Sequence, residues 1–302
     1  MVRLSGSLRT VDLGRVGIWS AVLRRGDAAQ AAEAATELDE LGYSALWIPG
    51  GAGGDILGDC RRLLEASRHA VVAPGILNIW MHEATDVATG HAALTHEHPG
   101  RFLLGLGVSH APAVERSNQS YTRPFSKMAD YLDELDAASP PVPHDEMVLA
   151  ALGPKMLKLS AERTAGAHPY FVPPEHTAIA RQALGAGPLL ATEQMVVLDS
   201  DPESARAIAR LNIARYLELP NYTNNLRALG YTDNDLSPPG SDRLVDAIVG
   251  WGDEAAIARR VQEHHDAGAD HVCVQVLLPD PAAFPRAEWR ALAPALIQGG
   301  HQ

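Results

Sequence analysis

The sequence predicts an α/β protein, a single closed (β/α)8 barrel of the TIM type. Short apolar, β-rich runs alternate along the chain with segments of helical periodicity, and eight such runs can be counted. Strict alternation predicts parallel strands joined by right-handed crossovers. The chain has 302 residues, a length that suits one barrel domain. Eight repeats therefore favour a closed barrel over an open doubly wound sheet, with residues 1–302 forming one domain.

The predicted strands are short and apolar, as expected for parallel strands that are buried on both faces. They cover residues 16–19, 45–48, 70–73, 102–106, 147–151, 167–172, 194–198 and 271–277. Helical periodicity predicts helices over residues 28–41, 86–96, 125–138, 155–164, 176–184, 202–218 and 253–267. Local signals support two of these boundaries. Asp201 before Pro202 is an N-cap candidate, and Gly42 is a helix stop before the second strand.

Residues 221–250 contain Asn-Asn, Asp-Asn-Asp and Pro-Pro-Gly and have no clear strand–helix repeat of their own. We interpret them as an inserted excursion before the last predicted helix. The loops that follow the strands of a barrel form its active-site face. The excursion is therefore a lid, an oligomer contact or an inert insertion, and the sequence does not choose among these.

Composition and charge indicate the kind of partner. Hydrophobic residues make up 46% of the chain, and no run of about 18 apolar residues is present to span a membrane. The formal net charge of −12 argues against nucleic acid and anionic membranes, which are bound through Lys and Arg. A small-molecule partner is expected. The first residues carry no secretory signal pattern, so we expect a cytoplasmic location.

Two turns between residues 147 and 176 are suited to binding a phosphate. The fifth predicted strand runs directly into Gly153-Pro154, and Pro is favoured at the first position of a helix. The sixth strand meets Pro173-Pro174-Glu175-His176 in the same way. A helix that begins at each turn leaves backbone N–H groups free for an anion. Two such turns on adjacent strands predict a cofactor site.

Other motifs restrict the chemistry. His110 is among the first polar residues after the fourth strand, and a His there is suited to general acid–base catalysis. The only lysines are Lys127, Lys155 and Lys158, all on predicted helices, which argues against Schiff-base chemistry in the barrel. No metal site is expected, because the sequence contains no histidine pair or cysteine set with ligand spacing.

Four motifs together resemble the bacterial luciferase-like barrel superfamily. They are GYSALW at 42–47, GILNIW at 75–80, RFLLGLGVS at 101–109 and ALGPKM at 151–156, and they span almost the whole chain in order. Within that superfamily the chain resembles the branch of probable oxidoreductases that use coenzyme F420, an 8-hydroxy-5-deazaflavin. The resemblance implies hydride transfer between this cofactor and a small organic substrate. Dimers are common in the superfamily, so it also implies a possible homodimer.

The resemblance places the cofactor phosphate at the turns after strands five and six, and a non-prolyl cis peptide behind the ring, here at Gly75-Ile76. The implied cofactor-binding residues are Gly75, Ile76, Gly107, Val108, Leu152, Gly153, Pro154, Pro173, Glu175, His176 and Thr177. Asn78, Trp80 and His82, after the third strand, are candidates for the substrate pocket.

The sequence departs from the superfamily pattern at one position that bears on catalysis. Several relatives carry an acidic residue and a His just after strand two, where this chain has Gly50 and Gly51. His110 therefore becomes the candidate proton donor or acceptor. Two alternatives stay open: an FMN-dependent monooxygenase, since the same barrel holds either ring, and a flavin-binding protein without catalysis.

Overall fold

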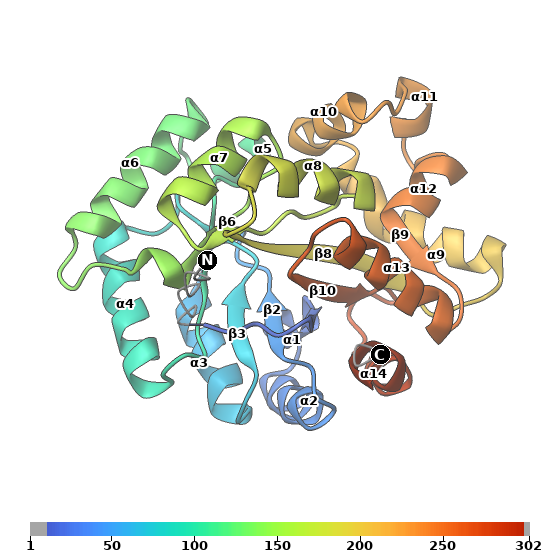
Figure 1. Ribbon diagram of the computed structural model, residues 1–302, viewed down its shortest axis with the longest axis horizontal. Coiled ribbons are helices and arrows are strands. Elements are labelled where there is room, and N and C mark those ends of the chain that lie inside the picture. Colours follow the sequence, from blue (N-terminus) through green and yellow to red (C-terminus); the bar gives the residue numbers. More distant parts are fainter. Residues whose placement is uncertain (1–10, 299–302) are drawn as a thin grey trace, which may run out of the picture.

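The parallel strands curve into a nearly closed barrel surrounded by helices, which confirms the predicted fold (Figure 1). The computed structural model describes residues 11–298. An isolated bridge between Val72 and Phe102 links the two ends of the strand order. In that order the barrel strands are β3 (Val71–Pro74), β2 (Ala45–Ile48), β1 (Val16–Trp19), β10 (His271–Val276), β8 (Leu189–Val197), β7 (Gly166–Ala167), β6 (Met147–Leu149) and β5 (Leu104–Gly107).

Two further short strands extend the sheet at the carboxyl ends of barrel strands. The strand β4 (Leu77–Asn78) continues the line of β3 and pairs with β5. The strand β9 (Val249–Trp251) pairs with the last residues of β8. Both additions lie at the end of the barrel where the loops after the strands gather.

Helices cover the outside of the barrel. They are α1 (Val22–Arg25), α2 (Ala28–Glu40), α3 (Ile56–Ala66), α4 (Ala84–Glu97), α5 (Ala111–Glu115), α6 (Pro124–Ala137), α7 (Pro154–Arg163), α8 (Pro174–Leu184), α9 (Pro202–Ile213), α10 (Pro220–Ala228), α11 (Asp233–Leu236), α12 (Asp242–Ile248), α13 (Glu254–Asp266) and α14 (Arg286–Ala293), with short turns η1 (His144–Glu146), η2 (Ala214–Tyr216) and η3 (Pro294–Gln298). The predicted N-cap is confirmed, because the Asp201 side chain accepts from the Ser204 N–H. Gly42 has a φ of 92°, as a helix stop requires.

Several predicted boundaries are wrong. The run 167–172 is a strand only at Ala167, and it contains Phe171, whose φ of 61° is a left-handed conformation that a strand does not accommodate. The strand predicted at 194–198 begins at Leu189. The helix α3 was not predicted, although Asp55 caps it through the Gly58 N–H. Residues 221–250, in which the sequence shows no clear repeat, fold as most of α10, then α11, α12 and the start of β9.

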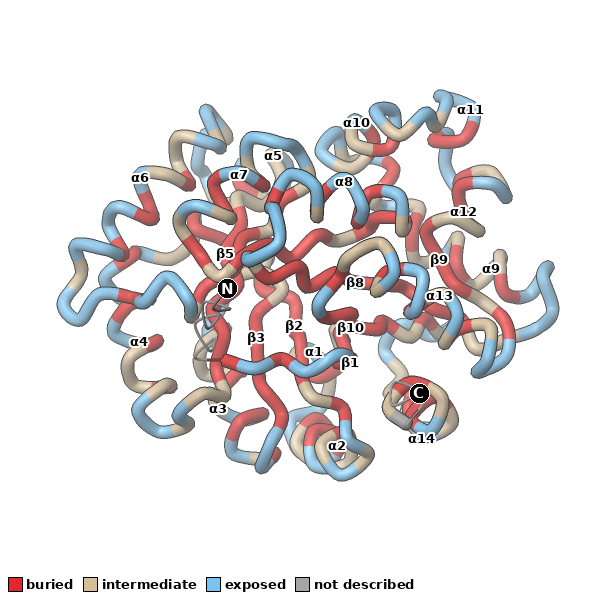
Figure 2. The backbone as a smooth tube through the Cα atoms, viewed as in Figure 1, coloured by how far each residue is buried: buried red, intermediate tan, exposed pale blue. Residues whose placement is uncertain are grey.

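The core has two layers, which follow from the alternation of side chains along the strands. On β10, Val272 and Val274 pack in the apolar layer beneath the helices. His271 and Cys273 face the barrel interior, where Trp47 stacks on His168 with ring centroids 4.2 Å apart. Figure 2 shows the strands buried and the outer helix faces exposed. No helix within residues 11–298 has the length and apolar character needed to cross a bilayer.

Candidate functional site

A bulge follows β3 at the mouth of the barrel. The Gly75–Ile76 peptide bond is cis, as predicted. Three glycines make room for this bulge. A Cβ added at Gly105 would lie 2.0 Å from the Pro74 carbonyl oxygen, one at Gly107 2.3 Å from Ile76 Cδ1, and one at Gly50 2.4 Å from the Ile76 carbonyl oxygen. The glycine-rich strand ends therefore serve the close approach of neighbouring backbones.

The two predicted anion-binding turns lie side by side. His176 Nε2 is 2.9 Å from the Leu152 carbonyl oxygen and joins the turn before α7 to the first turn of α8. Neither helix has a side-chain N-cap. A Cβ at Gly153 would meet no atom within 4 Å, so the space in front of α7 is open. The geometry therefore offers unpaired backbone N–H groups to an anion at two neighbouring helix starts.

Three predicted residues of the second turn have different surroundings. Pro173 is the N-cap of α8, and Glu175 is exposed. Thr177 is fully buried, and its hydroxyl lies 2.8 Å from Nδ1 of His264 on α13. The Thr177 side chain therefore anchors α8 to α13, and an anion at this turn would meet backbone N–H groups.

The predicted substrate residues connect the loops around the bulge. Asn78 is fully buried; its Nδ2 donates to the Gly51 carbonyl at 3.2 Å. Trp80 Nε1 donates to the Val108 carbonyl at 2.9 Å. Burial lowers the pKa of His82, and its Nε2 has no hydrogen-bond partner among the described residues. Asn78 and Trp80 therefore hold the mouth loops together, while His82 keeps a free ring nitrogen.

His110 lies at the start of α5, under residues of the predicted excursion. Its ring centroid is 5.0 Å from that of Tyr222 on α10. The neighbouring Ser109 carbonyl accepts from Asn221 Nδ2 at 3.3 Å. Burial lowers the pKa of His110, and its Nδ1 has no partner within residues 11–298. Residues 221 and 222 thus cover the loop after β5, and the lowered pKa of His110 favours its neutral form.

An aromatic cluster, which the sequence did not predict, fills the centre of the mouth. It consists of Trp19, Tyr170, Phe171, Tyr216 and Tyr222. The Tyr170 hydroxyl lies 2.7 Å from the Tyr216 hydroxyl and donates to Gln275 Oε1 at 2.9 Å. Its members come from three distant segments, so no spacing in the sequence indicates it.

Glu193, on β8, is a second feature that sequence reasoning missed, because the predicted strand began after it. It is 1% exposed; Oε2 accepts from the Phe171 N–H at 3.2 Å and Oε1 has no partner in the described part of the chain. Burial raises the pKa of Glu193 to about 8. The barrel interior therefore holds a carboxyl group that is mainly protonated at neutral pH.

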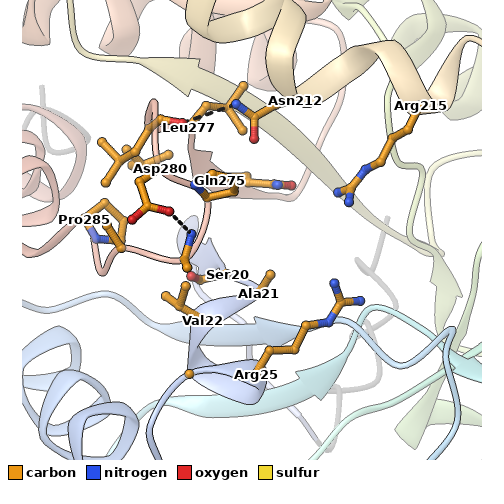
Figure 3. Close-up of a pocket in the computed structure, with 16 residues that line it drawn as sticks. Ser20, Ala21, Val22, Arg25, Asn212, Arg215, Gln275, Leu277, Asp280 and Pro285 are labelled. Carbon is orange, nitrogen blue, oxygen red and sulfur yellow. Dashed lines mark hydrogen bonds between the residues drawn. The ribbon is translucent and has the colours of Figure 1, made fainter.

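A cavity of about 320 Å³ opens on the other side of the aromatic cluster, at the carboxyl ends of β1 and β10 (Figure 3). Ser20 and Gln275 form its strand side, and η2 contributes Arg215. The bulge, the paired turns and this cavity all lie at the end of the barrel where active sites of the fold occur.

The comparisons identify the family. Residues 12–271 match the family model described as luciferase-like monooxygenase. This chain belongs to the luciferase-like monooxygenase family. No curated protein shows significant similarity to it. This family member has the fold of an F420-dependent secondary alcohol dehydrogenase in complex with an F420–acetone adduct, with a TM-score of 0.72 and 16% identity over 94% of this chain and 99% of that one.

Two further solved structures share the fold. One is the coenzyme F420-dependent tetrahydromethanopterin reductase from Methanopyrus kandleri, with a TM-score of 0.70 and 14% identity over 94% of this chain and 99% of that one. The other is a type II Baeyer–Villiger monooxygenase, the oxygenating constituent of 3,6-diketocamphane monooxygenase from Pseudomonas putida, in complex with FMN. It has a TM-score of 0.66 and 13% identity over 93% and 96% of the two chains. The family thus supports an enzyme that uses a flavin-type cofactor.

Proposed function

We propose that this protein is an oxidoreductase that transfers a hydride between coenzyme F420 and a small organic substrate. The observation that carries the proposal is the pair of uncapped helix starts at α7 and α8, joined through His176 and Leu152, beside the Gly75–Ile76 bulge. Structures of two F420-dependent enzymes share the fold, which supports the choice of cofactor.

The residues present fit a phosphate-bearing cofactor. The open space at Gly153 and the free N–H groups that follow it suit the phosphate. Leu152 and Pro154 shape the first turn, and the backbone from Pro173 to Thr177 shapes the second. The ring would lie against Gly75, Ile76, Gly107 and Val108. When bound, the cofactor supplies the hydride chemistry, while the protein orients it and excludes water.

His110 is the proposed proton donor or acceptor. Burial lowers the pKa of its ring, and Nδ1 has no partner among the residues that the structure describes. Such a nitrogen can exchange a proton with a substrate near neutral pH. Asn78, Trp80 and His82 are proposed to border the substrate. A small molecule is the proposed partner, and the cytoplasm is the proposed location.

Two other functions have specific support. An FMN-dependent monooxygenase is supported by the FMN complex with the same fold. A flavin-binding protein without catalysis is supported by Gly50 and Gly51, which bring no acid or base to the loop after β2. Because the phosphate turns suit either ring, the cofactor itself has to be tested.

The test is a titration of purified protein with coenzyme F420, FMN and FAD, followed by fluorescence quenching under anaerobic conditions. The proposal predicts tightest binding of F420 and hydride exchange with a substrate panel. Preference for FMN would favour the monooxygenase. Tight F420 binding without any hydride exchange would favour the binding protein.

A further inference from the structure

The cavity between β1, β10 and η2 has a composition that suits one class of ligand. Much of its wall is apolar and includes Val22, Leu277 and Pro285. Its volume of about 320 Å³ is at the lower end of the range for small-molecule sites. A small metabolite fits such a space better than a whole flavin nucleotide.

Two arginines at the cavity lack a carboxylate partner. Within residues 11–298, the Arg25 guanidinium has neither a hydrogen-bond nor an ion-pair partner. Among the described residues, Arg215 donates to the Tyr216 hydroxyl alone, at 2.7 Å, and lies 4.7 Å from the centroid of that ring. By contrast, the adjacent Arg24 is paired with Asp59 at 2.6 Å. Arg25 and Arg215 are exposed residues, and in a chain with a net charge of −12 two guanidinium groups without a carboxylate partner beside one cavity favour an oxyanion ligand.

The charge in the cavity is one-sided. Figure 3 shows the guanidinium groups of Arg25 and Arg215 on the same side of Gln275, with Asp280 on the opposite side. The Asp280 carboxylate accepts from the Ala282 N–H at 2.9 Å and so supports its own loop. The arginine end of the cavity is therefore positive, while the Asp280 end is not.

A chain of hydrogen bonds orients the polar group at the cavity floor. Arg215 donates to Tyr216, Tyr216 lies 2.7 Å from Tyr170, and Tyr170 donates to Gln275 Oε1. This chain uses the oxygen of Gln275, whose residue is 8% exposed, and leaves its Nε2 donor without a partner in the described chain. Because Gln275 lines the cavity, this N–H group is available to a ligand there.

The same residues connect the cavity to the proposed cofactor site. Tyr170 packs on Trp19, with ring centroids 5.2 Å apart. Trp19 Nε1 would lie 2.6 Å from a Cβ at Gly75, the first residue of the bulge. The Trp19–Tyr170 pair therefore links the cavity wall, through Gln275, to the place proposed for the ring.

We propose that this cavity binds a small organic acid. Its carboxylate lies between Arg25 and Arg215, its apolar body lies against Val22 and Leu277, and Gln275 Nε2 donates to a further oxygen of the ligand. The binding itself is independent of the cofactor. That the acid is the substrate rests on the proposed function.

The test is calorimetric titration of the cofactor-free protein with hexanoate, with its neutral counterpart hexanamide and with inorganic phosphate. Hexanoate is expected to bind at least tenfold more tightly than hexanamide and phosphate. The variants Arg25→Gln and Arg215→Gln should each lose at least tenfold in hexanoate affinity. Arg227→Gln is the matched control, because Arg227 on α10 pairs with Asp233 away from the cavity and should leave the affinity unchanged.

Three results of the hexanoate titrations would overturn this site. They are equal affinity for hexanoate and hexanamide, tighter binding of phosphate than of hexanoate, and unchanged hexanoate affinity in both arginine variants. Loss of F420 or FMN binding in these variants would also overturn it, since the arginines would then hold the cofactor. Hexanoate binding in a protein that binds no flavin-type cofactor would leave the site standing and refute the proposed function alone.

Discussion

Burial at single residues sets the protonation states inside this barrel. His168 and His271 are both 1% exposed or less, and burial lowers the pKa of each to about 4. Burial shifts the pKa of Glu193 in the opposite direction, to about 8, because its carboxylate form would be left in an apolar interior. All three groups are therefore mainly uncharged at pH 7, which lets polar side chains occupy the barrel without counter-ions.

Glu193 makes stability depend on pH in a defined direction. The unfolded chain loses this proton near pH 4.3, whereas the folded chain keeps it until about pH 8. Stability therefore falls as the pH rises through this window, by up to roughly 5 kcal/mol. Glu193→Gln should remove that loss, so its advantage over the wild type should grow between pH 5 and pH 9. Urea unfolding at pH 5 and pH 9 measures the difference in stability between Glu193→Gln and the wild type. The control is Glu218→Gln, at an exposed residue. The same dependence of stability on pH in the wild type and in E193Q would contradict the prediction.

His110 is tested by removing its ring. His110→Ala should lower kcat at least tenfold and leave cofactor affinity unchanged, because the ring handles a proton and does not touch the phosphate turns. Steady-state kinetics and cofactor titration of the same preparation separate the two effects. His96→Ala, an exposed residue of α4, is the control. Unchanged turnover in H110A would remove His110 from the mechanism.

At the scale of elements, one hydrogen-bonded chain positions the turn before α8, the second of the two proposed phosphate-binding turns. Thr177 on α8 contacts His264 on α13, and His264 Nε2 lies 2.7 Å from Gln194 Oε1 on β8. Burial lowers the pKa of His264 to about 3, so the ring is neutral and bonds through both nitrogens. The start of α8 is therefore held at a set distance from the barrel.

Breaking this chain should destabilise the fold. Thr177→Val keeps the volume and removes the hydroxyl, which leaves the buried His264 Nδ1 without a partner at a cost of about 1–3 kcal/mol. Urea denaturation measures the loss. The control is Thr89→Val, since the exposed Thr89 bonds only within α4, to the Thr85 carbonyl. Equal stability of T177V and the wild type would show that the contact contributes nothing.

At the scale of the whole molecule, the mouth is assembled from segments far apart in the chain. Tyr170 follows β7, Tyr216 and Tyr222 follow α9, and Gln275 is the penultimate residue of β10. Figure 1 shows α10, α11 and α12 grouped together at the upper right of the molecule. Through Tyr222 and Asn221 this group reaches the loop that carries His110. The interpretation of residues 221–250 as an insertion stays a prediction.

The sequence predicts the local features of this molecule better than the long-range ones. The strands Val16–Trp19 and Ala45–Ile48 have the predicted bounds, because runs buried on both faces are recognisable from composition. The turns at Gly153 and Pro173 were also predicted, since Gly and Pro act locally. Glu193 and the aromatic cluster were not, because burial and contacts between distant segments decide their properties.

The central claim is that the open start of α7 holds a cofactor phosphate. A substitution that introduces a negative charge at Gly153 tests this claim most directly. Gly153 has a φ of −88° and free space around it, so Asp and Asn both fit there and both can cap the helix.

The measurement is the anaerobic titration with coenzyme F420 of the wild type, Gly153→Asp and Gly153→Asn. The account predicts that G153D binds F420 at least tenfold more weakly than G153N because its carboxylate repels the phosphate, while both variants stay as stable as the wild type. Equal F420 affinity of G153D and G153N would contradict the account.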